Sequence, residues 1–235
     1  MALTRVQILK VAKKKKVAKL KEKLKASKKL ESQLLKQLAK LIEQDNEKFK
    51  KLTPARARVV LAQDVLKQLK TKKITATLGR YIDVVGDKGA AELVEKAKLT
   101  AQKDVVTVKL PACNVCAIGS VFVAAFNRFD EMKIYDFQNA FGEGTKYVDD
   151  TIISYLEQWF ESSQLRLMEA AFEPEEIARD MQFVEREEVS RAQQFRKEVL
   201  EKRFLQEGPY KETLANAVMV AIMKNIIKHK GTFNP

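Results

Sequence analysis

The stretch CNVCAIGSVFVAAFNRF, residues 113–129, decides the fold of this chain. Small residues alternate with large apolar ones at helical spacing along it, and it contains one charged residue. A helix that is apolar on all sides must be surrounded by other elements. We therefore predict a central buried helix over Cys113–Phe129, with small residues that let neighbours approach closely at Ala117, Gly119, Ala124 and Ala125.

Helix-favouring segments flank this centre on both sides. Thr53 and Pro54 are typical of an N-cap and a first helical residue, and the helix that they begin runs to about Thr71. Apolar periodicity predicts further helices over residues 90–101, 151–160, 165–172 and 211–229. β-Branched residues at 74–84 and 105–110 predict at most a small β element. The fold class is therefore mainly α, with a compact helical body at residues 54–235.

Residues 173–206 are highly charged and favour a long helix with a sparse apolar stripe. We interpret Glu173, Glu175 and Glu176, around Pro174, as the start of that helix. Acidic and basic residues alternate through Glu185–Arg191, which is typical of a solvated helix face. Residues 174–207 are interpreted as a charged helical insertion in the body.

Residues 1–53 form a lysine-rich arm that precedes the body. The arm holds 17 basic and 5 acidic residues, so it carries +12 of the formal net charge of +13. It has no Gly or Pro between Leu3 and Leu52, and its composition predicts a long basic helix. A coiled-coil-like stripe runs along it with interruptions at Ser27, Glu31 and Asp45, and its apolar members are Val17, Leu20, Leu24, Leu34, Leu38 and Leu41.

A concentrated positive field attracts polyanions, and nucleic acid is the first candidate. Lysine acts as a point charge, whereas reading of bases favours the arginine fork, so we expect salt-sensitive binding without sequence specificity. The alternatives are self-association or docking through the leucine stripe and a solvated tail. The candidate nucleic-acid-binding residues are Lys13, Lys14, Lys15, Lys16, Lys19, Lys21, Lys23, Lys25, Lys28 and Lys29, with Arg56 and Arg58 extending the patch onto the body.

Cys113 and Cys116 form a CxxC pair, the one motif in the sequence that is typical of a metal or redox site. Zinc requires four ligands, and His229 is the single histidine, so a closed site needs a carboxylate or a second chain. A redox pair needs a thiolate stabilised at a helix N-terminus. The third interpretation is that both are small buried residues of a packed helix, and this is the one we adopt. We therefore expect no catalytic residue, no metal and no cofactor.

Several short landmarks occur in order along the body. They are AQDVLKQL (62–69), GRYIDV (79–84), CNVCAIGSVF (113–122), YLEQWF (155–160), QLRLMEAAFE (164–173) and MVAIMKNIIKHKGTFNP (219–235). In this order the body resembles a family of small phage and bacterial proteins known as a domain of unknown function. Neither the arm nor residues 174–207 matches that pattern. The resemblance implies a phage or bacterial origin and a compact helical fold, and it implies no activity.

These observations predict a binding protein rather than an enzyme. We expect the arm to contact DNA or RNA and the body to dock on a protein partner. The alternatives are a virion-associated assembly protein that self-associates through its N-terminal helix and a CxxC metal or redox protein. No stretch approaches the roughly 20 apolar residues of a membrane span, and the N-terminus is not typical of a secretory signal. We therefore expect no membrane association, and a location in the bacterial cytoplasm or the virion.

Overall fold

The computed structural model describes residues 27, 30, 32–34, 36–37, 40–41, 44–79, 81–84, 89–100, 105–106, 110, 112–129, 132–133, 150–178, 185–207 and 211–235. The chain divides into two compact units, Met1–Lys51 and Leu52–Pro235. In the first unit, every described residue from Ser27 to Lys50 is helical. Uninterrupted helix formers without Gly or Pro explain this conformation.

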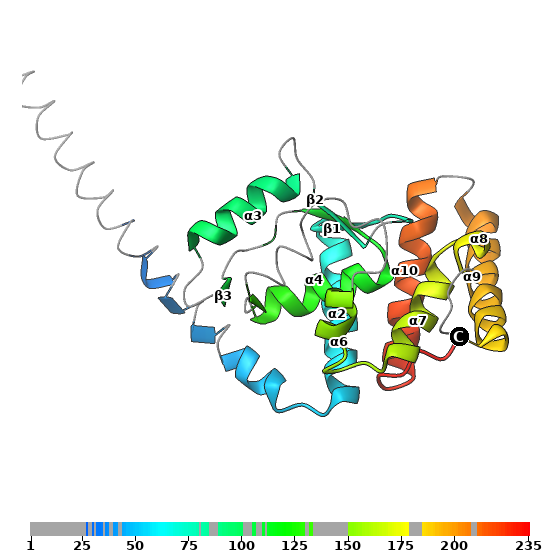
Figure 1. Ribbon diagram of the computed structural model, residues 1–235, viewed down its shortest axis with the longest axis horizontal. Coiled ribbons are helices and arrows are strands. Elements are labelled where there is room, and N and C mark those ends of the chain that lie inside the picture. Colours follow the sequence, from blue (N-terminus) through cyan, green and yellow to red (C-terminus); the bar gives the residue numbers. More distant parts are fainter. Residues whose placement is uncertain are drawn as a thin grey trace, which may run out of the picture. The chain divides into compact units, whose positions relative to one another are not determined.

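The second unit is mainly helical, as predicted (Figure 1). Its longer helices are α2 (Pro54–Lys70), α3 (Gly89–Thr100), α4 (Ala117–Phe129), α7 (Ser162–Phe172), α9 (Arg186–Glu207) and α10 (Lys211–Lys228). Two short helices, α6 (Asp150–Leu156) and α8 (Glu175–Ala178), flank α7 along the chain. Pro54 opens α2 and Thr53 occupies its N-cap, where the Thr53 carbonyl accepts a 2.9 Å hydrogen bond from the Ala57 amide.

Helix α4 is the buried centre of this unit. Each residue from Ala117 to Phe126 is buried, and the helix packs against α2, α6 and α7. Phe122 stacks on Phe126 and meets the Tyr155 ring edge-on at 5.2 Å between centroids. The prediction of a central buried helix is thus confirmed for α4. The first four residues of the predicted helix, 113–116, are not helical.

Cys113–Val115 is strand β4 rather than the first turn of that helix. It lies between β1 (Ile74–Ala76) and β2 (Ile82–Val84), parallel to the first and antiparallel to the second. Strand pairing with distant segments outweighs the local helical pattern here. At the edge of this sheet, the Ala76 amide donates a 3.0 Å bond to the Asn216 side chain of α10.

A second small sheet pairs β3 (Val105–Val106) with β5 (Met132–Lys133) in antiparallel fashion. Among the described residues, the β content is therefore two short sheets, in keeping with a mainly helical class. Figure 1 shows the three-stranded sheet beside α4, and α4 contacts both β1 and β4.

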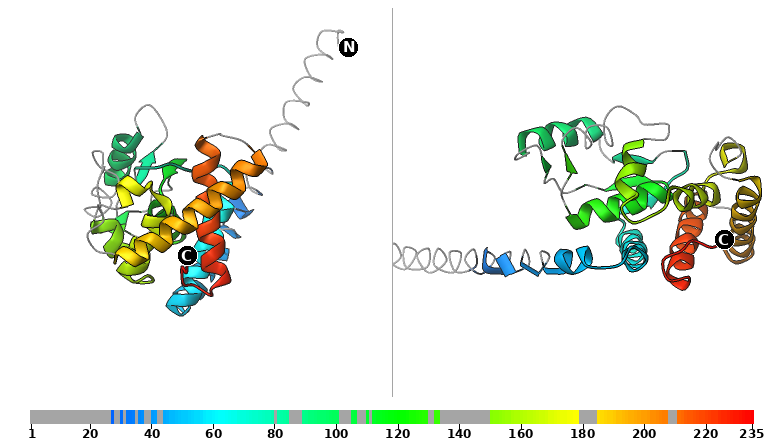
Figure 2. Two further views of the ribbon diagram at one scale, coloured as in Figure 1. Left: turned by 90° about the vertical axis from the view of Figure 1, so that its right-hand side faces the viewer. Right: turned by 60° about the horizontal axis from the view of Figure 1, so that its bottom comes forward.

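Helix α10 joins two sides of the body. It packs against α2 on one side and against α7 and α9 on the other, and it crosses α9 in the left view of Figure 2. Gly231, at φ +105°, ends the helix, where an added Cβ would lie 2.2 Å from the Ala55 carbonyl oxygen. The Gly231 amide bonds Ile226 O at 2.8 Å, so the chain turns back and the Phe233 amide reaches the Gln164 side chain.

Two predicted boundaries were wrong. The helix expected over 151–160 ends at Leu156, after which Glu157–Trp159 form a turn. The long helix expected from Glu173 begins instead at Arg186, as α9, after the non-helical Glu185. Glu173 caps the end of α7 in an extended conformation (φ −77°, ψ 155°), and Glu175–Ala178 form the separate short helix α8. Within the described residues, no helix has the length and apolar character to span a membrane.

Candidate functional site

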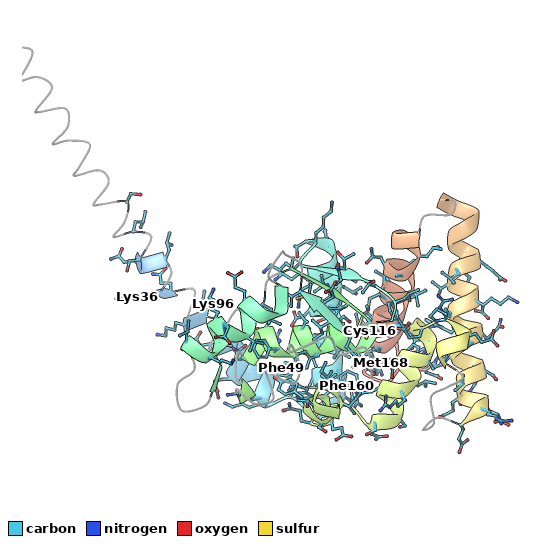
Figure 3. The ribbon with its side chains drawn as sticks, turned by 45° about the horizontal axis from the view of Figure 1, so that its top comes forward. Lys36, Phe49, Lys96, Cys116, Phe160 and Met168 are labelled. Carbon is cyan, nitrogen blue, oxygen red and sulfur yellow. The ribbon has the colours of Figure 1, made fainter. Side chains whose placement is uncertain are left out.

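The ten arm lysines predicted to bind nucleic acid, Lys13 to Lys29, lie outside the described residues. The described part of the arm carries exposed cations at Lys36, Lys40, Lys48 and Lys50. Lys36 is labelled in Figure 3. Lys50 pairs with Glu47 one turn earlier at 3.3 Å, and both side chains are about half exposed. Such a pair contributes little to stability.

Arg56 and Arg58, near the start of α2, have different environments. Arg56 is exposed. Arg58 donates from Nε to the Gly231 carbonyl and from Nη1 to the Trp159 carbonyl at 2.6 Å, and its guanidinium lies over the Phe160 ring at 5.8 Å. Burial lowers the pKa of Arg58, partly offset by the charge of Glu161. Arg58 therefore connects α2 to the turn after α6 and to the C-terminal turn.

Neither cysteine takes part in a disulfide bond, and both are buried. Cys113 belongs to β4, and Cys116 lies between that strand and the first turn of α4, where Gly119 N donates to its Sγ at 3.4 Å. The prediction that both lie in a packed helix was wrong for this reason, although their burial is confirmed. A cysteine after a strand and before a helix occupies the position that redox chemistry uses.

The electrostatic environment of the cysteines opposes that chemistry. Burial raises the pKa of Cys113 to about 12, with a further contribution from Asp83. Burial also raises the pKa of Cys116; the Gly119 amide acts against this, whereas Glu169 and Glu173 add to it. A thiolate, the reactive form, is therefore disfavoured at both positions.

A buried polar cluster that the sequence analysis did not identify surrounds Cys116. Glu169 and Glu173 lie one turn apart at the end of α7 and are 8% and 4% exposed. The Tyr81 hydroxyl donates to Glu169 Oε1, and Arg166 Nη1 lies 3.2 Å from Glu169 Oε2. Both oxygens of Glu173 accept from the Gly79 amide at 3.1 Å. The cluster thus joins α7 to the segment between β1 and β2.

Helix α9 completes the surroundings of Glu173. The Gln193 amide donates to the Ala170 carbonyl and to the Glu173 carbonyl, the latter at 3.0 Å, and Arg196 Nε donates to the Phe172 carbonyl at 3.2 Å. The last carbonyls of a helix have no partner within it. Side chains of the predicted insertion therefore cap α7, while Glu185, Arg186 and Arg191 remain exposed as expected of a solvated face.

Glu173 has the ionisation behaviour of a group that titrates near neutral pH. Burial raises its pKa to about 7; the Gly79 amide and Arg196 lower it, and Glu169 raises it. Burial likewise raises the pKa of Tyr81, and the neighbouring Glu169 adds to this effect. The cluster can hold a proton, but its described groups bond one another and no described set of three or more His, Cys, Asp or Glu side chains is arranged for a metal ion.

One signal in the sequence pointed to this cluster. In LMEAAFE, residues 167–173, two glutamates four residues apart lie within an otherwise apolar helical run. Carboxylates at such positions are buried only with partners. The partners Tyr81 and Gly79 lie about 90 residues earlier in the chain, and no local pattern connects them to α7. His229, the single histidine, bonds Asn225 Oδ1 at 3.0 Å, beyond the end of α10.

Comparisons with protein-family models, curated proteins and solved structures found no match to this chain.

Proposed function

We propose that this protein binds nucleic acid without sequence specificity through its basic arm. The supporting observation is the segregation of charge: residues 1–53 carry +12, and the remaining 182 residues carry +1. A near-neutral body needs no such arm for solubility, whereas a field of this size attracts phosphates and releases their counterions. The proposed contacts are Lys13–Lys16, Lys19, Lys21, Lys23, Lys25, Lys28 and Lys29, with Arg56 as an exposed extension.

Arg58 is left out of this proposed surface. Its Nε and Nη1 donate to carbonyls of the body, and its guanidinium lies over an aromatic ring. Removing it would therefore disturb the fold before it changed a phosphate contact. This difference between Arg56 and Arg58 provides a control for binding experiments.

The body is proposed to provide a protein-docking domain, and the protein to act in a bacterial cytoplasm or a virion. The location is supported by the family resemblance alone. For docking, the most exposed large apolar residue among those described is Leu99 of α3, at 86%. The CxxC alternative receives no support from the raised pKa values of its thiols.

Fluorescence anisotropy of the full chain with a short DNA duplex and with RNA tests the nucleic-acid proposal. We compare wild type with a variant in which Lys13, Lys14, Lys15 and Lys16 are replaced by Gln. Because each phosphate contact contributes about 0.9 to the slope of log K against log salt, the slope should fall by about 3 to 4. Affinity should differ little between unrelated sequences of equal length.

A matched control removes four exposed body lysines, Lys70, Lys73, Lys224 and Lys228, by the same substitution to Gln. This variant has the same net charge as the arm variant, and it should retain the wild-type slope. If the salt slope falls equally in both variants, only net charge matters for binding, and a specific role of the arm is overturned. Absence of binding by wild type at low salt would overturn the proposal itself.

A further inference from the structure

The described part of the arm helix carries a leucine face, which we define as Leu30, Leu34 and Leu41. These side chains are 56%, 57% and 62% exposed. With 3.6 residues per turn, Leu34 and Leu41 lie within about 40° of Leu30 around the helix axis. The leucine face is therefore an apolar stripe over about three turns of helix, with Gln37 between Leu34 and Leu41.

Most residues beside the leucine face are uncharged, although the arm is strongly basic; Asp45 lies about 60° from Leu30, and Lys48 lies in line with Leu30, four residues beyond Gln44. Within about 60° of Leu30 on either side lie Ser27, Gln33, Gln37 and Gln44, all of them exposed. Lys36 and Lys40 project at about 80° to 120° from Leu30. A phosphate backbone would contact a basic face, whereas the described side chains of this face between Ser27 and Gln44 are Leu, Ser and Gln, which suit an identical face.

We propose that the leucine face pairs with the same face of a second copy of this chain, in a parallel two-stranded coiled coil. In the heptad that this requires, Leu34 and Leu41 take a positions and Leu30 takes a d position. This register differs from the sequence-predicted stripe, since Leu30 joins it and Leu38 lies outside the described residues. It extends the proposed function of the arm but does not depend on nucleic-acid binding.

Charge complementarity selects the parallel orientation. In this heptad Lys40 takes a g position and Asp45 the following e position, and both are exposed. In a parallel pair, g of one helix lies beside the following e of its partner, so Lys40 of each copy faces Asp45 of the other. An antiparallel pair brings g beside g and e beside e, so Lys40 of one copy would not face Asp45 of the other.

The parallel orientation has a second consequence. It brings together the N-terminal parts of two arms, where residues 1–29 carry 12 basic and 1 acidic side chains. Their mutual repulsion opposes pairing and is screened by salt. Self-association should therefore strengthen with salt, whereas nucleic-acid binding should weaken with it. The opposite signs make failure of one proposal distinguishable from failure of the other.

Sedimentation equilibrium of the full chain without nucleic acid tests the pairing. Three leucines give a short seam, so we expect a monomer–dimer equilibrium with Kd on the order of tens of μM at moderate salt. Leu34→Gln with Leu41→Gln leaves the arm charge unchanged and should raise Kd at least about tenfold. A wild-type monomer up to several hundred μM would overturn the proposal.

The matched control changes the opposite side of the same helix. Ser32 and Asn46 lie about 160° from Leu30, and replacing both with Gln should leave the dimer Kd unchanged. If this control weakens the dimer as much as the leucine variant does, the leucine face is not the seam and the proposal fails.

A charge-reversal series tests the orientation. Lys40→Glu alone and Asp45→Lys alone each place like charges opposite one another and should weaken the parallel dimer several-fold. The double variant restores opposite charges and should recover the wild-type Kd. Failure of the double variant to recover, or a dimer that weakens as salt rises, would overturn the parallel arrangement.

Discussion

At the scale of single residues, Gly119 shows how closely the elements of the body approach one another. A Cβ at this position would lie 1.7 Å from the Tyr81 carbonyl oxygen, and that same oxygen accepts a 3.2 Å hydrogen bond from the Cys116 amide. The backbone of the segment leading into β2 thus rests directly on the first turn of α4. The sequence predicted a close approach at Gly119, and this is confirmed.

Gly119→Ala should destabilise the body by about 3 kcal/mol or more, because backbone atoms rather than a flexible side chain would have to move. Urea denaturation followed by circular dichroism measures the loss. Asn127→Ala, at an exposed position of the same helix, should change stability by no more than about 0.5 kcal/mol. A neutral Gly119→Ala would contradict the contact with Tyr81.

Glu173 should make stability depend on pH. Its pKa is raised from 4.5 to about 7 in the folded protein, so the folded state favours the protonated acid. The resulting stabilisation is fully present below pH 4.5 and is lost as pH rises through about 7. Glu173→Gln removes this dependence, and from pH 5 to pH 8 the variant should gain about 2 to 3 kcal/mol relative to wild type.

Denaturation of both proteins across this pH range measures the difference. Glu175→Gln, at an exposed position two residues later, controls for the loss of one carboxylate. If the difference between wild type and Glu173→Gln is the same at pH 5 and pH 8, Glu173 does not hold a proton in the folded state.

At the scale of elements, α9 acts as a cap for α7 as well as a charged surface helix. Its polar side chains meet the carbonyls of Ala170, Phe172 and Glu173, which have no partners within α7. Charge and sparse hydrophobicity predicted a solvated face for this region, which is correct for one side of α9. The other side of α9 donates hydrogen bonds to the end of α7, between 20 and 24 residues earlier in the chain.

Gln193→Ala should cost about 1 to 3 kcal/mol, because it leaves two carbonyl groups at the end of α7 without this donor. Gln194→Ala is the matched control, since the neighbouring Gln194 bonds only the exposed Glu198 on the same helix at 3.1 Å among the contacts described. Thermal unfolding followed by circular dichroism compares the two. Equal losses would show that helix propensity, rather than capping, determines the result.

At the scale of the whole molecule, stability and nucleic-acid binding should be separable. Arg58→Lys retains the charge but loses the fork that reaches Gly231 and Trp159, and it should destabilise the body by about 1 to 3 kcal/mol. At temperatures where the variant is folded, its affinity for a DNA duplex should equal that of wild type. Substituting Lys13–Lys16 with Gln should lower the affinity for the DNA duplex and leave the stability of the body unchanged.

Unfolding midpoints and anisotropy titrations on the same preparations provide both measurements. Arg56→Lys serves as the control for Arg58→Lys, because Arg56 is exposed and the substitution retains its charge. A loss of duplex affinity in Arg58→Lys, with the fold intact, would show that Arg58 belongs to the nucleic-acid-binding surface.

The amino-acid sequence by itself determined the helical class, the buried centre in α4 and the segregation of charge, because helical periodicity and net charge are properties of neighbouring residues. The tertiary structure alone decided that Cys113 belongs to a strand, that Arg58 is directed into the body and that Glu169 and Glu173 form a buried cluster. Each of these depends on a backbone or side-chain partner between 29 and 173 residues away. Pairing over such separations is set by how the helices pack, and no local pattern encodes it.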